Sequence, residues 1–179
     1  MTDQELIQNF AKPELNRQVF NHILEKYQKK IYWHIRKMVI DHDDADDVTQ
    51  ETFIKVWSNL ASFRADAQLY TWIYRIATNE CLNFLAKKKK HFASDIYDWN
   101  EIIANNESNP LLDGDAIQIK LQKALLTLPD KQRLVFNMKY FDEMQYNEIA
   151  KITGTSEGAL KASYHIAAKK IEEFLNFDS

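Results

Sequence analysis

DHDDADDVTQETFIKVWSNL, residues 41–60, is the stretch that most clearly shows how this chain folds. Its opening carboxylates break the apolar pattern before them and are of the type that caps the first turn of a helix. Small and apolar residues then recur at three- and four-residue steps, the period of a helix with one buried face. We therefore predict a helix over residues 44–60. Its inner face would consist of Ala45, Val48, Thr52 and Val56, with Phe53, Trp57 and Leu60 alongside.

The same period runs through most of the chain. Only three glycines and three prolines interrupt 179 residues, which is too few for a turn-rich β-sandwich or barrel. We expect an all-α fold. Further helices are predicted over residues 14–39, 70–88, 130–141, 146–152 and 156–174, and a helical stripe is formed by Ile117, Leu121, Leu125 and Leu128 and stops at Pro129.

Residues 94–114 lose this period and divide the chain. They carry five acidic residues, no lysine or arginine, and helix breakers such as Pro110, which is typical of a linker. We expect two small helical domains, residues 1–93 and 115–179, joined by this acidic linker. In the second domain, Gly154 lies in a turn between a short and a long helix, the layout of a helix-turn-helix.

The outer face of the 44–60 helix is a candidate docking surface. A face of carboxylates and an amide around one apolar residue suits a basic helical partner. The alternative is an ordinary solvated helix face. The residues on this face are Asp47, Gln50, Glu51 and Ile54.

Aromatic and basic residues interleave from residue 63 into the 70–88 helix. Aromatic rings stack on unpaired bases, amides bond to base edges and lysines follow phosphates. The alternative is that these aromatic residues belong to the core. The candidate nucleic-acid residues are Phe63, Arg64, Tyr70, Arg75, Asn79, Lys87 and Lys88.

The long helix after Gly154 offers a third surface. Small residues at its leading end would let the backbone approach the floor of a DNA groove, while lysines reach phosphates and a histidine contacts a base edge. The alternative is an ordinary helical hairpin. The candidate residues are Gly158, Lys161, Ala162, His165 and Lys169.

The net charge indicates how tightly the chain alone binds DNA, and the single cysteine indicates the cellular compartment. The net charge is −3 and neither predicted domain is strongly basic, so the chain alone should bind DNA weakly. Cys81 is the single cysteine and shares a helical face with Ile73 and Ala77, which indicates a buried residue in a reducing compartment. No apolar run is long enough to cross a bilayer, and no signal-peptide layout is present. We expect a cytoplasmic protein without membrane insertion.

The three surfaces, in this order, resemble the extracytoplasmic-function (ECF) group of bacterial sigma factors over nearly the whole chain. The family carries a D-D-x-x-Q-E-x-F core-binding motif, an F-R block followed by T-W-L-Y-R-I-A-x-N, and a C-terminal promoter-binding domain. The matching segments here are DDVTQETF (46–53), FR (63–64), TWIYRIATN (71–79), LP (128–129) and YNEIA (146–150).

The resemblance implies a role for each surface. A sigma region 2-like bundle would dock on the clamp helices of the largest subunit of core RNA polymerase, and residues 63–70 with Asn79 would capture a flipped base of the −10 promoter element. A region 4-like domain would place the 156–170 helix in the major groove of the −35 element, with polymerase's flap region as a further partner. The linker would thread toward the RNA exit path. Regulated members of the family also bind an anti-sigma factor.

The last helix departs from the family. Its usual pattern resembles V-K-S-R-x-x-R-A-R, whereas this chain has LKASYHIAA at residues 160–168, and only Lys161 keeps its charge. Either the −35 contacts rely on the backbone, Lys161, His165 and Lys169, or the domain binds its element loosely.

Two other kinds of function are alternatives. A free-standing helix-turn-helix regulator would bind DNA tightly without polymerase, and a helical adaptor would accept a partner helix. An enzyme is the least favoured class, because no Ser/His/Asp set, glycine-rich phosphate loop or HExxH spacing occurs. We expect no catalytic residue, no cofactor and no metal site.

Overall fold

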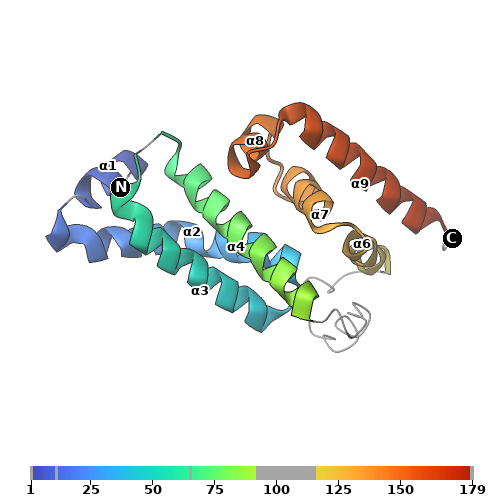
Figure 1. Cartoon of the computed structure of the whole chain (residues 1–179), viewed down its shortest axis with the longest axis horizontal. Helices are drawn as coiled ribbons and strands as arrows, with labels where there is room; N and C mark the ends of the chain where they lie inside the picture. Colours follow the sequence, from blue (N-terminus) through green and yellow to red (C-terminus); the bar gives the residue numbers. More distant parts are fainter. Residues whose placement is uncertain (1, 11, 65, 92–115, 178–179) are drawn as a thin grey trace. The chain divides into compact units, whose positions relative to one another are not determined.

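The computed structural model describes residues 2–10, 12–64, 66–91 and 116–177, and these residues form helices and turns with no strand. The all-α prediction is confirmed. The chain divides into two compact units, Met1–Cys81 and Leu82–Ser179, shown in Figure 1. The division falls inside the helix α4 (Leu69–His91). The predicted domain limits at residues 93 and 115 and the predicted linker, residues 94–114, lie outside the described residues.

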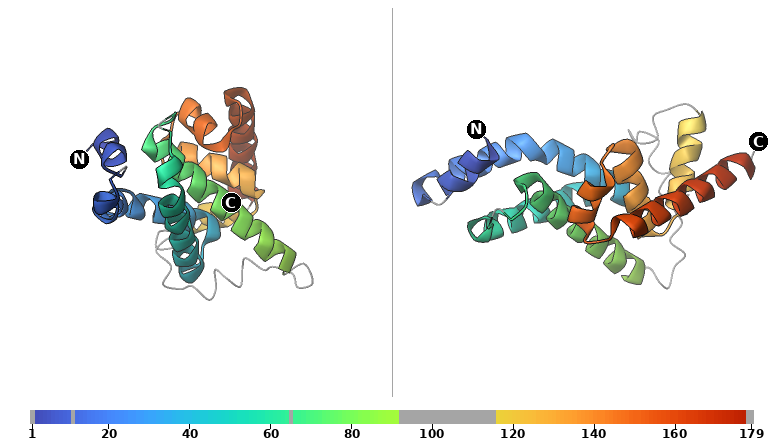
Figure 2. Two further views of the ribbon diagram at one scale, coloured as in Figure 1. Left: turned by 60° about the vertical axis from the view of Figure 1, so that its left-hand side comes forward. Right: turned by 90° about the horizontal axis from the view of Figure 1, so that it is seen from above.

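Three long helices form the first unit: α2 (Asn16–Val39), α3 (His42–Asn59) and α4. They run side by side in Figure 1 and Figure 2. A buried hydrogen bond of 2.9 Å between His34 Nε2 and Thr78 Oγ1 links α2 to α4. A salt bridge between Lys55 and Glu80 links α3 to α4. The core residues with at most 1% exposure include Ile23, Ile31, Ile35, Met38, Ala45, Val56, Ile73, Ala77 and Cys81.

A side-chain cap fixes the start of α3, as the acidic cluster predicts. The Asp41 carboxylate accepts a hydrogen bond of 3.0 Å from the backbone N–H of Asp44. Backbone N–H groups in the first turn of a helix have no partner inside the helix, so this bond stabilises the helix end.

Replacing this cap should destabilise the first unit. Asp41→Ala is expected to lower the free energy of unfolding by about 1 kcal/mol, because one N–H in the first turn loses its acceptor. Urea denaturation followed by circular dichroism measures the change. Asp41→Asn keeps a capping oxygen and should stay within a few tenths of a kcal/mol of the native chain. An equal loss in both variants would show that the negative charge, and not the cap, stabilises the helix.

A short N-terminal helix that the sequence analysis did not predict packs on α2. This helix is α1 (Asp3–Phe10), and a 3-10 turn (Pro13–Leu15) joins it to α2. The Tyr27 hydroxyl donates to the Asp3 carboxylate at 2.9 Å. Burial, and then the hydrogen bond to Asp3, raises the pKa of Tyr27, so the hydroxyl stays protonated and keeps donating. Only Leu6 and Phe10 of α1 are buried, too few to give a periodic signal.

The second unit contains four further helices among its described residues: α6 (Ala116–Leu126), α7 (Asp130–Phe136), α8 (Tyr146–Thr153) and α9 (Glu157–Phe177). A π-helical segment, Asn137–Phe141, follows α7, where the prediction had a continuous helix. Ile117, the first residue of the predicted helical stripe, is 71% exposed and lies outside the core. The core joins α6, α7 and α9 through Ala124, Leu125, Leu128, Phe136, Ala167 and Ile171.

The turn between α8 and α9 has the expected geometry. Gly154 ends α8 with φ +71°, a left-handed conformation that glycine adopts without strain. Ser156 Oγ then accepts from the backbone N–H of Ala159 at 3.2 Å and caps α9. At the other end of α8, Glu148 Oε2 accepts from the N–H of Gln145 at 2.9 Å. These local bonds hold the two helices of the helix-turn-helix.

Candidate functional site

The outer face of α3 is exposed along the helix. Asp47, Gln50, Glu51 and Ile54 are all exposed, and Ile54 is 56% exposed although it is a large apolar side chain. Their spacing of three and four residues places them on one side of the helix. The structure therefore brings together the four residues of the predicted docking surface.

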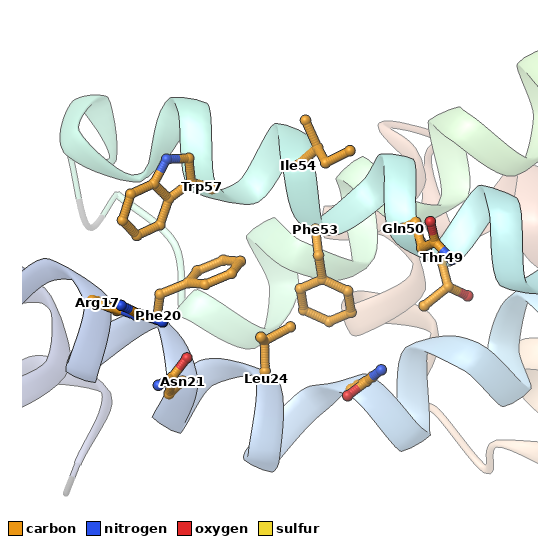
Figure 3. Close-up of a pocket in the computed structure, with 10 residues that line it drawn as sticks. Arg17, Phe20, Asn21, Leu24, Thr49, Gln50, Phe53, Ile54 and Trp57 are labelled. Carbon is orange, nitrogen blue, oxygen red and sulfur yellow. The ribbon is translucent and has the colours of Figure 1, made fainter.

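An apolar groove lies beside this face, between α2 and α3 (Figure 3). Its volume is about 750 Å³, and Gln50 and Ile54 belong both to its lining and to the α3 face. Trp57 closes one end, where its ring meets Phe20 edge-on at 5.0 Å and Phe10 of α1 at 5.8 Å. Together the α3 face and the groove make a surface with an apolar centre and a polar margin. The groove is lined by Arg17, Phe20, Asn21, Leu24, Gln28, Thr49, Gln50, Phe53, Ile54 and Trp57.

The α2 side of this groove was not predicted from the sequence. Phe20 and Leu24 follow the apolar period of the 14–39 helix, yet both are only half-buried. Trp57, predicted to lie next to the inner face of its helix, is 42% exposed. The signal available in the sequence was the wide apolar stripe of this helix, but its period does not show which part of the stripe the neighbouring helices cover.

A second exposed series runs along α4. Arg75, Asn79, Asn83 and Lys87 are all exposed and recur at four-residue steps, so each lies about one turn beyond the last. Lys88 is half-buried, with its Nζ 5.7 Å from the ring centroid of Phe84. The series offers guanidinium, amide and ammonium groups that can follow a nucleic-acid strand.

The aromatic residues before this series are partly packed. Phe63 is half-buried, and its ring lies 4.9 Å from that of Trp72. Tyr70 is also half-buried and lies 4.4 Å from Tyr74, which belongs to the core. Arg64 is exposed. Phe63 and Tyr70 thus combine a packed side with a solvent-accessible side, which suits a platform for a stacked base.

The third predicted surface lies on α9. Gly158, Lys161, Ala162, His165 and Lys169 are all exposed, and their spacing places them on one side of the helix. The opposite side buries Leu160, Ala167 and Ile171. The helix therefore presents its small and basic residues away from the core of the second unit, as a groove-entering helix requires.

Comparison with known proteins assigns both units to one family. Residues 23–91 match Sigma-70 region 2, and residues 118–171 match Sigma-70, region 4. The ECF RNA polymerase sigma factor SigW of Bacillus subtilis (strain 168) is 31% identical over 163 residues, 84% of this chain and 85% of SigW. This chain belongs to the ECF group of RNA polymerase sigma factors. It is therefore a transcription initiation factor that works with core RNA polymerase and promoter DNA.

Other relatives align with nearly the full length of this chain. The ECF RNA polymerase sigma-E factor of Escherichia coli (strain K12) is 30% identical over 182 residues, 96% of this sigma factor and 93% of that one. Among solved structures, CnrH in complex with the cytosolic domain of CnrY aligns with a TM-score of 0.71 at 21% identity, over 99% of each chain. RpoE of Bartonella quintana, in complex with the anti-sigma factor NepR, aligns with a TM-score of 0.67 at 21% identity, over 89% of this chain and 98% of that one. These structures support the fold of the sigma factor.

Region 2 corresponds to most of α2, with α3 and α4, and region 4 to the helices from α6 to α9. The helix α1 precedes the residues that match region 2. None of the helices in the described ranges has the combined length and apolar character needed to cross a bilayer.

Proposed function

We propose that this sigma factor binds core RNA polymerase through the α3 face and the adjoining groove. Ile54 carries this proposal, because it is 56% exposed between the carboxylates of the α3 face and the apolar groove. An apolar centre with a charged margin gives affinity through burial and orientation through charge. The partner that fits is a basic helical surface with apolar residues at its centre, as the clamp helices of the largest polymerase subunit provide in this family.

The two remaining surfaces would contact the promoter. The unpaired non-template strand of the −10 element would contact Phe63, Arg64, Tyr70, Arg75, Asn79, Lys87 and Lys88. Capturing an unstacked base offsets an unpairing cost of a few kcal/mol, so melting needs no chemistry from this chain. The exposed side of α9 would enter the major groove at the −35 element. Polymerase supplies catalysis and much of the positive charge, which lets a chain with pI near 6.0 act on DNA.

We also propose that an anti-sigma factor regulates this chain in the cytoplasm. Two proteins of similar fold, CnrH and the sigma factor RpoE, were solved with bound partners, and the partner of RpoE is the anti-sigma factor NepR. An inhibitor that covered the α3 face and groove would compete directly with polymerase, because both partners would need the same apolar centre.

Run-off transcription tests the function. Core RNA polymerase with the purified chain should give discrete transcripts from genomic templates, and mapping their 5′ ends should reveal shared sequences near −10 and −35. Core polymerase alone is the control. A gel-shift with the chain alone separates the rival function, because a free-standing regulator would bind duplex DNA tightly without polymerase. Tight binding in ordinary salt together with no effect on transcription would overturn the proposal.

A further inference from the structure

Two lysines from different elements of region 4 lie within cation–π distance of the Tyr146 ring. Lys139 Nζ, in the π-helical segment, is 4.9 Å from the centroid of the Tyr146 ring. Lys161 Nζ, on α9, is 5.7 Å from the same centroid. Both distances are within the roughly 6 Å over which an aromatic ring attracts an ammonium group. One ring at the start of α8 therefore contacts two ammonium groups from different elements.

The position of this ring is set by the core of region 4. Tyr146 meets Tyr164 edge-on at 6.4 Å, and Tyr164 stacks on Phe136 at 5.4 Å with an interplanar angle of 14°. Phe136 is only 5% exposed. Lys139 has a second interaction besides the ring contact, because its Nζ donates a hydrogen bond of 3.3 Å to the backbone carbonyl of Met144. The two ammonium groups are thus tied to a fixed aromatic stack.

Two ammonium groups on one ring attract an anion. Each ammonium group keeps its positive charge at the ring, so two of them in contact with one side chain favour an anionic partner such as a phosphate backbone. Burial raises the pKa of Tyr146, with a further contribution from Tyr164, so the hydroxyl stays neutral beside the lysines. Lys161 lies on the exposed side of α9 with Gly158 and Ala162. The positive pair therefore lies next to the surface proposed to enter the DNA groove.

We propose that Tyr146 is a positioning residue that holds Lys139 and Lys161 as a pair for the phosphate backbone of promoter DNA beside the −35 element. The inference rests on the proposed −35 role of region 4 and adds two residues to it, Tyr146 and Lys139. A lysine that is already held by a ring loses less conformational freedom when it binds. This arrangement lets a helix poor in arginine, in a chain of net charge −3, make phosphate contacts of fixed geometry.

The test uses reconstituted holoenzyme and a promoter fragment mapped by run-off transcription, with equilibrium binding measured over a series of potassium chloride concentrations. Tyr146→Phe keeps the ring and should bind within about twofold of the native chain. Tyr146→Leu should bind about fivefold more weakly, because the ring attraction is lost.

The salt dependence of binding tests the phosphate contacts. Lys161→Gln and Lys139→Gln should each reduce the slope of log affinity against log salt concentration by about one. Tyr146→Leu should also reduce this slope, and combining it with Lys161→Gln should cost less than the product of the two single effects.

Three results would overturn the inference: equal losses in Tyr146→Phe and Tyr146→Leu, an unchanged salt slope in Tyr146→Leu, or effects that multiply in the double variant. A methylphosphonate scan of the promoter covers the case in which Tyr146→Leu unfolds region 4. Neutralising one phosphate beside the −35 element should weaken the native chain and leave Lys161→Gln unaffected, and equal sensitivity in both would refute the contact. Failure of the native holoenzyme to transcribe would instead refute the proposed function.

Discussion

Asp47→Lys should reduce the affinity of this sigma factor for core RNA polymerase by at least about 100-fold, the effect of a like-charge contact that costs about 3 kcal/mol. The side chain is exposed on the α3 face, so the reversed charge faces a basic partner and repels it. Gln50→Ala should also weaken binding strongly, because Gln50 belongs to both the α3 face and the groove. Co-purification with core polymerase and surface-immobilised binding measure the loss.

The matched control for this charge change is Glu172→Lys. Glu172 is exposed on α9, outside the α3 face, and the substitution changes the net charge of the chain by the same amount. It should bind core polymerase as the native chain does. Circular dichroism and thermal unfolding should be unchanged in all three variants. Full co-purification of both Asp47→Lys and Gln50→Ala with polymerase would show that the docking surface lies elsewhere.

Asn79→Ala should slow open-complex formation about tenfold, as expected when an amide loses hydrogen bonds to a base edge worth about 1.4 kcal/mol. Initial promoter binding should change by less than about twofold, because phosphate contacts supply most of that affinity. In the proposed role the amide would act only after a base has left the stack, so its loss should raise the cost of melting and leave the closed complex intact.

Permanganate reactivity of thymines in the −10 region measures the rate of open-complex formation. A gel-shift at low temperature, where the complex stays closed, measures initial promoter binding. Asn83→Ala, one turn further along α4 and also exposed, is the matched control and should melt the promoter at a rate close to that of the native chain. Undiminished thymine reactivity in Asn79→Ala would count against base capture by this amide. An equal defect in both variants would indicate a general effect of polar groups on α4.

Local signals predicted most of the helices because each depends on residues within a few turns. The cap at Asp41 and the left-handed turn at Gly154 are formed by bonds between near neighbours, and such bonds act almost regardless of the rest of the fold. The π-helical segment Asn137–Phe141 was missed because a stretch of five residues is too short for its period to be distinguished from that of an α-helix. The helix α1 was missed because it presents only two buried residues.

The candidate surfaces were predictable to different degrees. Asp47, Gln50, Glu51 and Ile54 fall on one side of a single helix, so the period of that helix was enough to group them. The α2 wall of the groove was not predictable in the same way. Whether Phe20 and Leu24 are covered depends on how closely α3 approaches α2, which the spacing of residues along either helix does not specify.

The sequence by itself determined most of the helices, many of their exposed faces and the sigma factor motifs, because a helical period and a contiguous motif are properties of one segment. The tertiary structure alone decided where segments meet. It opens the groove between α2 and α3, and it brings Lys139 and Lys161 over the ring of Tyr146. These arrangements follow from packing between helices, whose distances depend on side chains far apart in the chain.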